Sequence, residues 1–506
     1  MGTRHLLKST YKALNNIACH FYPAVPFDAA YRPEDAGTMK SYNRNRPYGP
    51  SPVLCYAPFR SLFFNTEGHA LSCCKNTKVV LGTYPQQSIR EMWEGQNIHK
   101  LREHILHNDL SFGCYKCREA LQAGNYAAMT SCGFDFLRAH KKSNYPQLME
   151  FELSNQCNLE CVMCSGRVSS GISSKSHNPQ SRKTPYDLAF ADQLEPFIPA
   201  LKQARFYGGE PFLIDLYYEI WERMLRHNPA INLYVLTNGT ILNEKVKALL
   251  KRGRFTIHVS VDSFNPELYE KIRVNARFSQ TMNNLQYFIQ YMKTHGQRLC
   301  IYVTPTRMNW QEIPEMVRQC DSMGTDIYFS TAWYPAHLSL WNLPLEELEA
   351  IERTYNNAPL SRTRNGKAFK MMRSEITRWV LMQKQDPEYR AHFLQYAVRQ
   401  EEKPEDALTE IIESDADLYK TRLAENLLQA CQNEDRVSEL ITKIDQLIVA
   451  GDLNALVVYY YLKGLSPGHI IERLLSEPME KNLGFLQSKQ EEILSTIQIK
   501  PGSDEG

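Results

Sequence analysis

Short apolar stretches alternate with amphipathic ones through the middle of the chain. Six of the apolar stretches predict β-strands: LMEFELS (148–154), ARFYGGE (204–210), NLYVLTN (232–238), TIHVSVD (256–262), LCIYVTP (299–305) and DIYFST (326–331). The segments between them have helical periodicity, as in residues 196–203, 216–227, 243–252 and 279–295. Strands and helices in this order predict an α/β fold with a parallel sheet, either an open doubly wound sheet or a partial barrel.

The segments on either side have different patterns and divide the chain into four predicted parts. Residues 1–50 are rich in Pro, Tyr, Asn and Arg, which indicates a loose N-terminal arm. Residues 51–145 form a small cysteine-containing unit with short strand signals, one helix at 88–106 and a helical linker at its end. Residues 146–345 hold the strand–helix alternation, and residues 346–506 predict a charged, helical C-terminal extension.

Composition and charge limit the partners of the protein. A chain of 506 residues with a formal net charge of +2 has no strong overall field, and we find no apolar run that could span a bilayer. Two short basic segments, 44–49 and 138–145, are interpreted as solvated loops. We therefore expect neither a membrane nor a nucleic acid as partner.

The basic opening segment bears on the compartment. It has no acidic residue before Asp28 and no continuous apolar stretch, so we exclude a secretory signal and expect a cytoplasmic protein, with an organellar presequence as the alternative. Ten of the 13 cysteines lie before residue 165, many at ligand-like spacing. In a reducing compartment such clusters favour metal binding over disulfides.

Three of these cysteines, Cys157, Cys161 and Cys164, stand in one short loop directly after the first of the six strands. A structural zinc site needs four ligands, often from two separated CxxC pairs. A 4Fe–4S cluster needs one thiolate per iron, so three cysteines would leave one iron free for a substrate or cofactor. The loop follows the C-terminal end of its strand, where the active sites of β/α barrels assemble.

A C-x3-C-x2-C loop after the first strand of a (β/α)6-like pattern resembles the radical SAM superfamily. The resemblance implies a partial TIM barrel whose three cysteines bind a 4Fe–4S cluster, with S-adenosylmethionine (SAM) on the open iron. After the second strand, the sequence matches the family's GGEP motif, which holds the methionine amino group. Glycine lets the backbone approach a ligand closely, and a carboxylate can pair with an ammonium. The matching residues are Gly208, Gly209, Glu210 and Pro211.

Further SAM contacts follow from the same resemblance. Ser260 and Asp262 end the fourth strand in a segment similar to the family's S-x-D element, near the ribose and methionyl groups. Arg273 lies in a segment that resembles the family's helix-start arginine and is expected to pair with the SAM carboxylate. Met163 takes the bulky position beside the adenine, and Asn309 lies in a family-like turn. An ordinary strand end or a solvated helix residue is the alternative at these positions.

A second group of cysteines lies in the N-terminal unit. A lone cysteine, a Gly-x4-Cys element, the helix at 88–106 and a C-x2-C pair follow one another, and this order resembles the SPASM/twitch module, which binds auxiliary iron–sulfur clusters. That module usually follows the barrel, whereas here it precedes it, and the region does not supply the cysteines for two clusters. The resemblance implies one auxiliary 4Fe–4S cluster with four thiolate ligands: Cys55, Cys73, Cys114 and Cys117.

Two alternatives stay open in this unit. Four cysteines that include one CxxC pair would also satisfy a tetrahedral zinc ion. Cys74 is the rival of Cys73 as a ligand, and Cys132 is interpreted as an inert buried thiol.

The resemblance implies a radical SAM oxidoreductase. A reduced cluster would cleave SAM to a 5′-deoxyadenosyl radical, which abstracts a hydrogen atom from a peptide side chain or a small biosynthetic intermediate. The auxiliary cluster would then take an electron, so the substrate is oxidised or cross-linked. A low-potential donor such as flavodoxin or ferredoxin would be the partner. A redox-neutral epimerase is one alternative, and a non-catalytic zinc-binding scaffold is the alternative of another class.

Several chemically active side chains could not be assigned from the sequence. An epimerase would need a hydrogen donor, for which Cys300 and Cys320 are candidates, although a buried core thiol is the ordinary interpretation. Candidate bases lie on predicted strands, but the face to which each side chain points was not determined. These bases are Tyr207, His258, Tyr302 and Tyr328.

Overall fold

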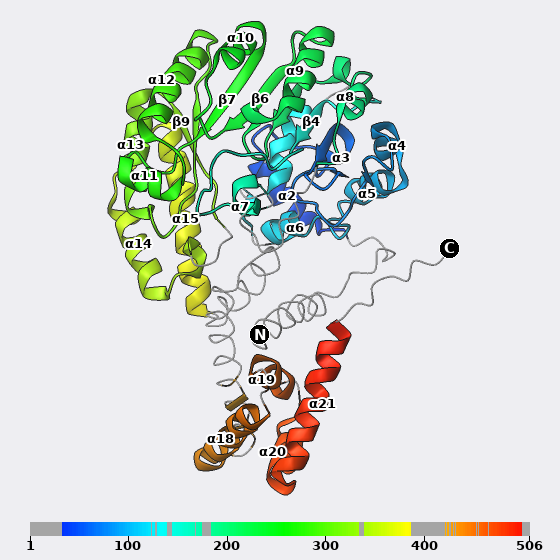
Figure 1. Ribbon diagram of the computed structural model, residues 1–506, viewed down its shortest axis with the longest axis vertical. Helices are drawn as coiled ribbons and strands as arrows, with labels where there is room; N and C mark the ends of the chain where they lie inside the picture. The colour runs from blue at the N-terminus through cyan, green and yellow to red at the C-terminus, as the bar shows by residue number, and fades with distance from the viewer. Residues whose placement is uncertain are drawn as a thin grey trace. The chain divides into compact units, whose positions relative to one another are not determined.

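A computed structural model gives the structure of the chain (Figure 1). It describes residues 33–385 and 420–497, apart from short gaps at 123, 127–128, 139–143, 167, 175–183, 333–337, 421–422, 425–426, 429, 431, 452, 454 and 464. Most of the predicted arm and the opening segment, where a secretory signal was excluded, lie outside these ranges, as do Cys19 and Cys431.

One nine-stranded sheet organises the larger part of the protein, in the order β3-β2-β1-β4-β5-β6-β7-β8-β9. The strands from β4 to β9 are all parallel and follow chain order, as a partial (β/α)6 barrel requires. The prediction of a parallel α/β fold is therefore confirmed. These strands are β4 (Leu148–Phe151), β5 (Gln203–Phe206), β6 (Asn232–Thr237), β7 (Arg254–Ser260), β8 (Cys300–Val303) and β9 (Asp326–Phe329).

The N-terminal unit contributes strands to the same sheet, which the sequence analysis did not foresee. Strand β1 (Ser61–Phe64) pairs in parallel with β4, so that Phe63 faces Glu150 in the register. Strands β2 (His69–Leu71) and β3 (Gly82–Thr83) extend β1 as an antiparallel meander. The cysteine-containing unit is thus built onto the first edge of the barrel sheet.

Two helix predictions need correction. The segment at 88–106 is two helices, α4 (Ile89–Glu94) and α5 (Gln96–Leu106), because the backbone of Gly95 is extended (φ −77°, ψ 170°) and a Cβ there would lie 2.7 Å from Glu91 O. The segment at 196–203 is only a 3-10 turn, η3 (Ile198–Ala200), since β5 already begins at Gln203.

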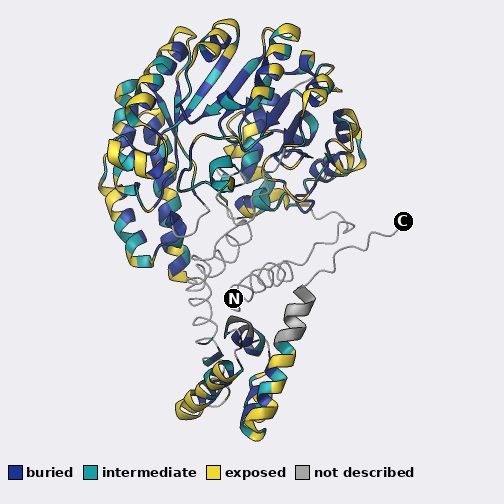
Figure 2. Ribbon diagram, viewed as in Figure 1, coloured by how far each residue is buried: buried dark blue, intermediate teal, exposed yellow. Residues whose placement is uncertain are grey.

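The other predicted helices of the barrel form and cover one face of the sheet (Figures 1 and 2). On this outer face, the ring of Phe206 packs at 5.2 Å from that of Trp221, and Ile257 N lies 3.4 Å from Met292 Sδ. Alternate residues of the strands point to the opposite, inner face. The barrel helices are α8 (Leu188–Leu194), α9 (Asp215–His227), α10 (Glu244–Arg252), α11 (Pro266–Ile272), α12 (Phe278–Thr294) and α13 (Ile313–Met323).

Residues 33–50 contain a helix, α2 (Ala36–Asn45), with a fully buried tyrosine. Tyr42 Oη lies 2.8 Å from Ser131 Oγ, and Arg46 forms a buried ion pair with Asp135. Both partners belong to η2 (Thr130–Leu137), which follows the last cysteine pair of the unit. This part of the predicted arm therefore packs against the cysteine-containing unit.

The chain divides into two compact units, and the second consists of helices. Helices α14 (Leu345–Asn357) and α15 (Arg364–Gln385) follow the barrel. The described helices of the second unit share an apolar core that includes Leu440, Ile444 and Tyr459. They are α18 (Glu434–Ala450), α19 (Ala455–Lys463), α20 (Pro467–Ser476) and α21 (Met479–Ile497). Among the described residues, every helix is too short or too polar to cross a bilayer.

Candidate functional site

The three-cysteine loop is fixed by hydrogen bonds on both sides. Cys157 N donates to Ser170 Oγ (3.1 Å), and Ser170 N donates back to Asn155 O (2.7 Å). On the other side, Val162 N donates to Ile272 O (2.9 Å), at the end of α11. The loop is thereby held over the C-terminal ends of the parallel strands, as predicted.

A buried arginine, Arg273, lies beside this loop. Its Nη1 lies 3.9 Å from Cys161 Sγ, and its Nη2 lies 2.7 Å from Asp262 Oδ2. Asp262 is fully buried, and its other oxygen accepts from Thr304 N (2.7 Å). A hydrogen bond from the Cys164 thiol and the charge of Arg273 lower the pKa of the Cys161 thiol. A thiolate, which is the form that binds metals, is thus favoured at Cys161.

The turn after β5 brings the GGEP segment against the cysteine loop. Gly208 and Gly209 have positive φ (+77° and +40°), and Glu210 N donates to Gln156 O (2.8 Å). A Cβ at Gly209 would lie only 2.1 Å from Gln156 O. This position requires glycine for its conformation and for the close approach of the two backbones.

A Gly209→Ala change tests this contact. The left-handed backbone conformation alone costs about 1–2 kcal/mol, and the clash with Gln156 must also displace the loop. We expect a lower free energy of unfolding and less iron bound after reconstitution. Gly296→Ala is the matched control, because Gly296 has a φ of +67° and no neighbouring atom within 4 Å. Equal losses in both variants would show that the contact with the loop is unimportant.

The Glu210 carboxylate already accepts hydrogen bonds from neighbouring residues of the protein. It is fully buried, and its carboxylate accepts from Thr237 Oγ1 (2.7 Å), Asn238 N (2.7 Å) and Phe212 N (3.1 Å). Burial raises the pKa of Glu210 to about 7, although these hydrogen bonds oppose the shift. Glu210 thus joins the ends of β5 and β6 directly beside the cysteine loop.

The turn after β6 adds a polar network that the sequence analysis missed. Asn238 Nδ2 donates to Asn158 Oδ1 (3.0 Å) and lies 3.9 Å from Cys157 Sγ. Asn158 Nδ2 donates to Thr240 Oγ1 (2.9 Å), which in turn donates to Asn238 Oδ1 (2.6 Å). This closed ring connects the β6 turn to the cysteine loop. The T-N-G-T run at 237–240, directly after a strand, was the available signal.

The remaining residues predicted to contact SAM lie around the same strand ends. Ser260 is the last residue of β7 and pairs with Tyr302 in the register, while Met163 is half-buried in the loop. Pro211 begins the turn η4 (Pro211–Leu213). Asn309 is fully buried, and its Nδ2 donates to Asp262 O (2.8 Å), so it acts on the site through Asp262.

The four N-terminal thiols predicted as ligands gather in one place. Burial, with the charges of Cys73, Cys117 and Cys55, raises the pKa of the Cys114 thiol well above its ordinary value, which reflects their mutual proximity. Cys73 is buried in an apolar cluster with Phe134 and Leu148, and Cys55 packs against this cluster. Four neighbouring thiols can each bind one iron of a cluster.

Cys74 and Cys132 differ from this group. Cys74 is exposed, and burial of its thiol together with the charges of Glu150 on β4 and of Glu152 just after it raises its pKa to about 12. Cys132 Sγ lies 3.6 Å from Tyr42 Oη. Within the described ranges, no three His, Cys, Asp or Glu side chains form a group that could hold a single metal ion. A four-iron cluster places its thiolates on different irons, so its ligands need not converge on one point.

The strand register shows to which face of the sheet the four candidate bases point. All four lie on the inner face, where they join further polar side chains that were not singled out. In the register, Glu150 pairs with Arg205, Arg205 with Tyr234, and Tyr302 with Tyr328. His258 pairs with Cys300, one step before the pair of Ser260 and Tyr302. We call the polar side chains of this face the inner-face array: Glu150, Arg205, Tyr207, Tyr234, His258, Tyr302 and Tyr328.

Hydrogen bonds and ring contacts connect the members of the array. Tyr234 Oη donates to Tyr302 Oη (3.2 Å) and lies 3.1 Å from His258 Nδ1. The rings of Tyr302 and Tyr328 lie 4.6 Å apart. Arg205 donates to Glu150 Oε2 (3.2 Å), so the only arginine in the array is neutralised within it. The inner face is therefore polar and aromatic, with little net charge.

The histidine of the array should make stability depend on pH. Burial and the charge of Arg205 lower the pKa of His258 to about 4, from 6.5. Between these values the unfolded chain binds the proton that the folded chain does not, so stability falls as the pH drops from 6.5 towards 4. The wild-type protein should lose free energy of unfolding between pH 7 and pH 5, and His258→Gln should reduce that loss by about 2 kcal/mol, measured by urea unfolding. An unchanged loss would contradict the shifted pKa.

The two candidate donor cysteines lie on opposite sides of the sheet. Cys300 begins β8 on the inner face, where its register partner is His258. Cys320 is fully buried in α13, on the outer side, and its backbone carbonyl accepts from Thr325 Oγ1. Cys320 is therefore a core thiol, and only Cys300 lies on the face of the array.

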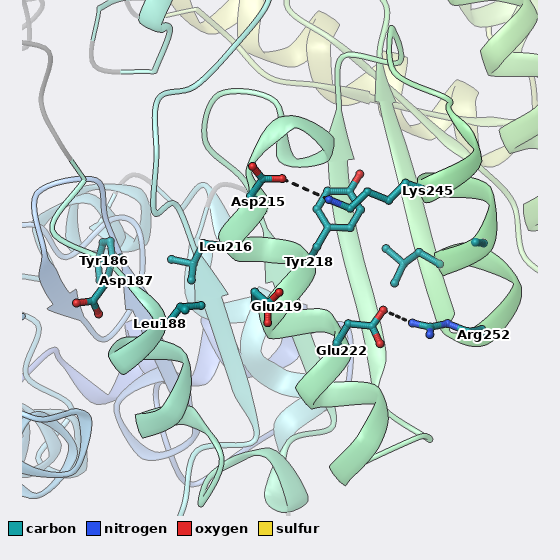
Figure 3. A pocket seen from close by; sticks show the side chains of 12 residues that line it. Tyr186, Asp187, Leu188, Asp215, Leu216, Tyr218, Glu219, Glu222, Lys245 and Arg252 are labelled. Atoms are coloured by element: carbon teal, nitrogen blue, oxygen red, sulfur yellow. Dashed lines mark hydrogen bonds and ion pairs between the residues drawn. The ribbon is translucent and has the colours of Figure 1, made fainter.

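An open groove of about 780 Å³ lies on the outer surface, between α8, α9 and α10 (Figure 3). Ion pairs cross it from Lys245 to Asp215 (3.3 Å) and from Arg252 to Glu222. The groove is on the helical side of the sheet, away from the inner-face array, and contains none of the predicted ligands.

Comparison with known families agrees with this geometry. Residues 151–320 match the model of the Radical SAM superfamily, and residues 55–118 match SPASM, an iron–sulfur cluster-binding domain. The chain therefore carries a radical SAM domain preceded by a SPASM-type domain, and the family prediction is confirmed. These domains use SAM with a 4Fe–4S cluster and an auxiliary iron–sulfur cluster, respectively.

Individual relatives are distant. The chain is 24% identical over 176 residues to a probable GTP 3′,8-cyclase of Methanocaldococcus jannaschii, which covers 35% of this chain and 55% of that protein. It is 29% identical over 137 residues to the GTP 3′,8-cyclase of Aquifex aeolicus, covering 26% and 40%. The chain thus spans about half, or less, of the length of these curated relatives.

Two solved structures give weaker similarities. Native anSMEcpe with bound AdoMet is 19% identical, with a TM-score of 0.31, over 41% of this chain and 59% of that one. Streptococcus suis SuiB bound to the precursor peptide SuiA is 16% identical, with a TM-score of 0.30, over 50% and 56%.

Proposed function

We propose that this protein is a radical SAM oxidoreductase that oxidises or cross-links a C–H-bearing substrate, either a peptide side chain or a small biosynthetic intermediate. The observation that carries the proposal is the three-thiol loop above the parallel strands, with Arg273 beside Cys161. Three thiolates leave one iron of a 4Fe–4S cluster without a protein ligand. When bound there, SAM supplies a carbon radical that abstracts a hydrogen atom.

The residues around the loop fit this cofactor pair. Cys157, Cys161 and Cys164 would hold the cluster as thiolates. Gly208 and Gly209 present backbone that a Cβ would obstruct, which suits the methionine amino group. Because the Glu210 carboxylate already accepts three hydrogen bonds, we assign it to positioning that backbone.

Further residues would contact SAM from the neighbouring strand ends. Arg273 would pair with the SAM carboxylate while Asp262 holds its guanidinium in place. Ser260 would face the ribose and Met163 the adenine, with Pro211 ending the glycine turn. In the N-terminal unit, Cys55, Cys73, Cys114 and Cys117 would bind the auxiliary cluster, which accepts an electron.

The inner-face array bears on the substrate. The GTP 3′,8-cyclases are named for a nucleoside triphosphate. Such a ligand needs several cations, whereas the one arginine of the array is bound to Glu150. We therefore propose a substrate whose reacting part is uncharged. Epimerisation of such a substrate is the second candidate, favoured by the position of Cys300 on the inner face.

Protein purified without oxygen and reconstituted with iron and sulfide tests the proposal. About eight irons per chain are expected for two four-iron clusters. Addition of SAM and a chemical reductant, which stands in for a proposed flavodoxin or ferredoxin, should give 5′-deoxyadenosine. Stoichiometric zinc without deoxyadenosine would overturn the proposal and leave a metal-binding scaffold. Solvent deuterium in a substrate-derived product would indicate the epimerase.

A further inference from the structure

The phenols of the inner-face array lie directly beneath the candidate SAM site. Ser260, at the end of β7, pairs with Tyr302 on β8. Two residues after Tyr302, just past the end of β8, Thr304 N donates to Asp262, which holds the arginine beside the cysteine loop. Residues two apart on a strand share a face and lie about 6.5 Å apart. Tyr302 therefore lies two residues before Thr304, the residue that binds Asp262, and its side chain is on the inner face of the sheet.

The direction of the hydrogen bonds leaves one phenolic hydrogen available. Tyr234 Oη donates to Tyr302 Oη (3.2 Å), so the hydrogen of Tyr302 itself points elsewhere. Among the described residues, no acceptor is found for that hydrogen. Since Tyr234 donates its only hydrogen to Tyr302, we assign the ring hydrogen of His258 to Nδ1, which then donates to Tyr234 Oη (3.1 Å). The three groups form a directed row, from His258 through Tyr234 to Tyr302.

The surroundings keep this row in its neutral form. Arg205 and Glu150 face it from β5 and β4 as a bound pair. Two further phenols lie beside it: the ring of Tyr328 on β9 is 4.6 Å from that of Tyr302, and the ring of Tyr207 after β5 is 5.7 Å from that of Tyr234. Burial raises the pKa of Tyr302 to about 12, while His258 is uncharged near pH 7. The phenols therefore keep their hydrogens under the conditions in which the site would work.

We propose that Tyr302 is a hydrogen-atom donor of this site, and that Tyr234 and His258 return the proton to it. The inference rests on the proposed function, because it requires the carbon radical. In the absence of substrate, the O–H bond of Tyr302 breaks and a C–H bond forms on deoxyadenosine. The resulting phenoxyl radical takes one electron from the added reductant and one proton from Tyr234. His258 gives its Nδ1 proton to Tyr234 and takes one proton from water at Nε2, so all three groups end neutral. With substrate bound, the substrate carbon radical would take the hydrogen of Tyr302 in place of the deoxyadenosyl carbon.

Deuterium in deoxyadenosine tests the proposal without a known substrate. Reconstituted protein is exchanged into D2O and incubated with SAM and reductant, and the deoxyadenosine is analysed by mass spectrometry. Phenolic hydrogens exchange with solvent, so the unmodified protein should give monodeuterated deoxyadenosine. Tyr302→Phe should lose most of that deuterium, and Tyr291→Phe should retain it. Tyr291 is the matched control because its phenol donates to Gly253 O on the outer side.

A second variant covers the case in which Tyr302→Phe does not fold. Tyr234→Phe keeps the donor but removes its proton supply, so a first deuterated product per chain should form and later ones should form more slowly. An unchanged time course would overturn the relay. Deuterium that persists in Tyr302→Phe, or that is lost only in Cys300→Ser, would overturn Tyr302 as donor. Failure of the unmodified protein to form any deoxyadenosine would instead overturn the proposed function.

Discussion

Changing Cys157, Cys161 and Cys164 together to Ala is expected to abolish deoxyadenosine formation and to remove about half of the bound iron. The three thiols are the ligands assigned to the cluster in this loop, and reductive cleavage of SAM needs that cluster. The four N-terminal thiols lie in a separate cluster of side chains and should keep their share of iron. Iron analysis and chromatography of the nucleosides would measure both effects.

The control for this variant removes thiols that are assigned to neither cluster. Cys132→Ala combined with Cys320→Ala should retain the iron and the deoxyadenosine, because Cys132 contacts Tyr42 and Cys320 is a core residue. Complete loss of iron from the triple variant would mean that the N-terminal thiols hold no iron of their own. If the metal retained were zinc, the N-terminal unit would hold a structural zinc ion in place of an iron–sulfur cluster.

A matched pair of single variants decides between the two adjacent cysteines of that unit. Cys73 is buried beside the other three thiols, whereas Cys74 is exposed. Cys73→Ala should therefore lose iron and Cys74→Ala should retain it. The reverse result would exchange their assignments.

The parts of the fold set by local pattern were predictable. Each of the six barrel strands lies where branched and aromatic residues concentrate, because such residues fit a sheet that is covered on one face. The pairing of β1 with β4 was not predictable in the same way, since residues 61–64 and 148–151 are far apart in the chain. Neither segment carries a local signal of the other.

The inner-face array could have been read from the sequence, although it was not. Phe206, Val235 and Val259, on three neighbouring strands, are fully buried and point to the same face of the sheet. The residues between them, including Tyr234 and His258, must therefore point to the opposite face. By contrast, the hydrogen bonds of Glu210 depend on where β6 ends in space, so the motif alone indicated a ligand contact where the structure has an internal one.

Arg46→Met is expected to destabilise the protein by about 3–5 kcal/mol, because it leaves Asp135 buried without its charged partner. The two side chains are 0% and 2% exposed, and Arg46 Nε donates to Asp135 Oδ2 at 2.9 Å. The free energy of unfolding in urea would measure the loss. The double variant Arg46→Met with Asp135→Leu should recover most of it, since it removes both charges.

The same ion pair should also affect the N-terminal thiols. Arg46 Nη1 donates to Val53 O (2.7 Å), two residues before Cys55, and Asp135 belongs to the same turn as Phe134, which packs on Cys73. Breaking the pair loosens the chain on both sides of this thiol cluster. Arg46→Met should therefore retain less iron than the double variant after reconstitution, while the three-cysteine loop keeps its share. If iron were lost equally from both variants, the pair would stabilise the fold without positioning the ligands. If stability were unchanged, residues 33–50 would be the loose arm that their composition predicts.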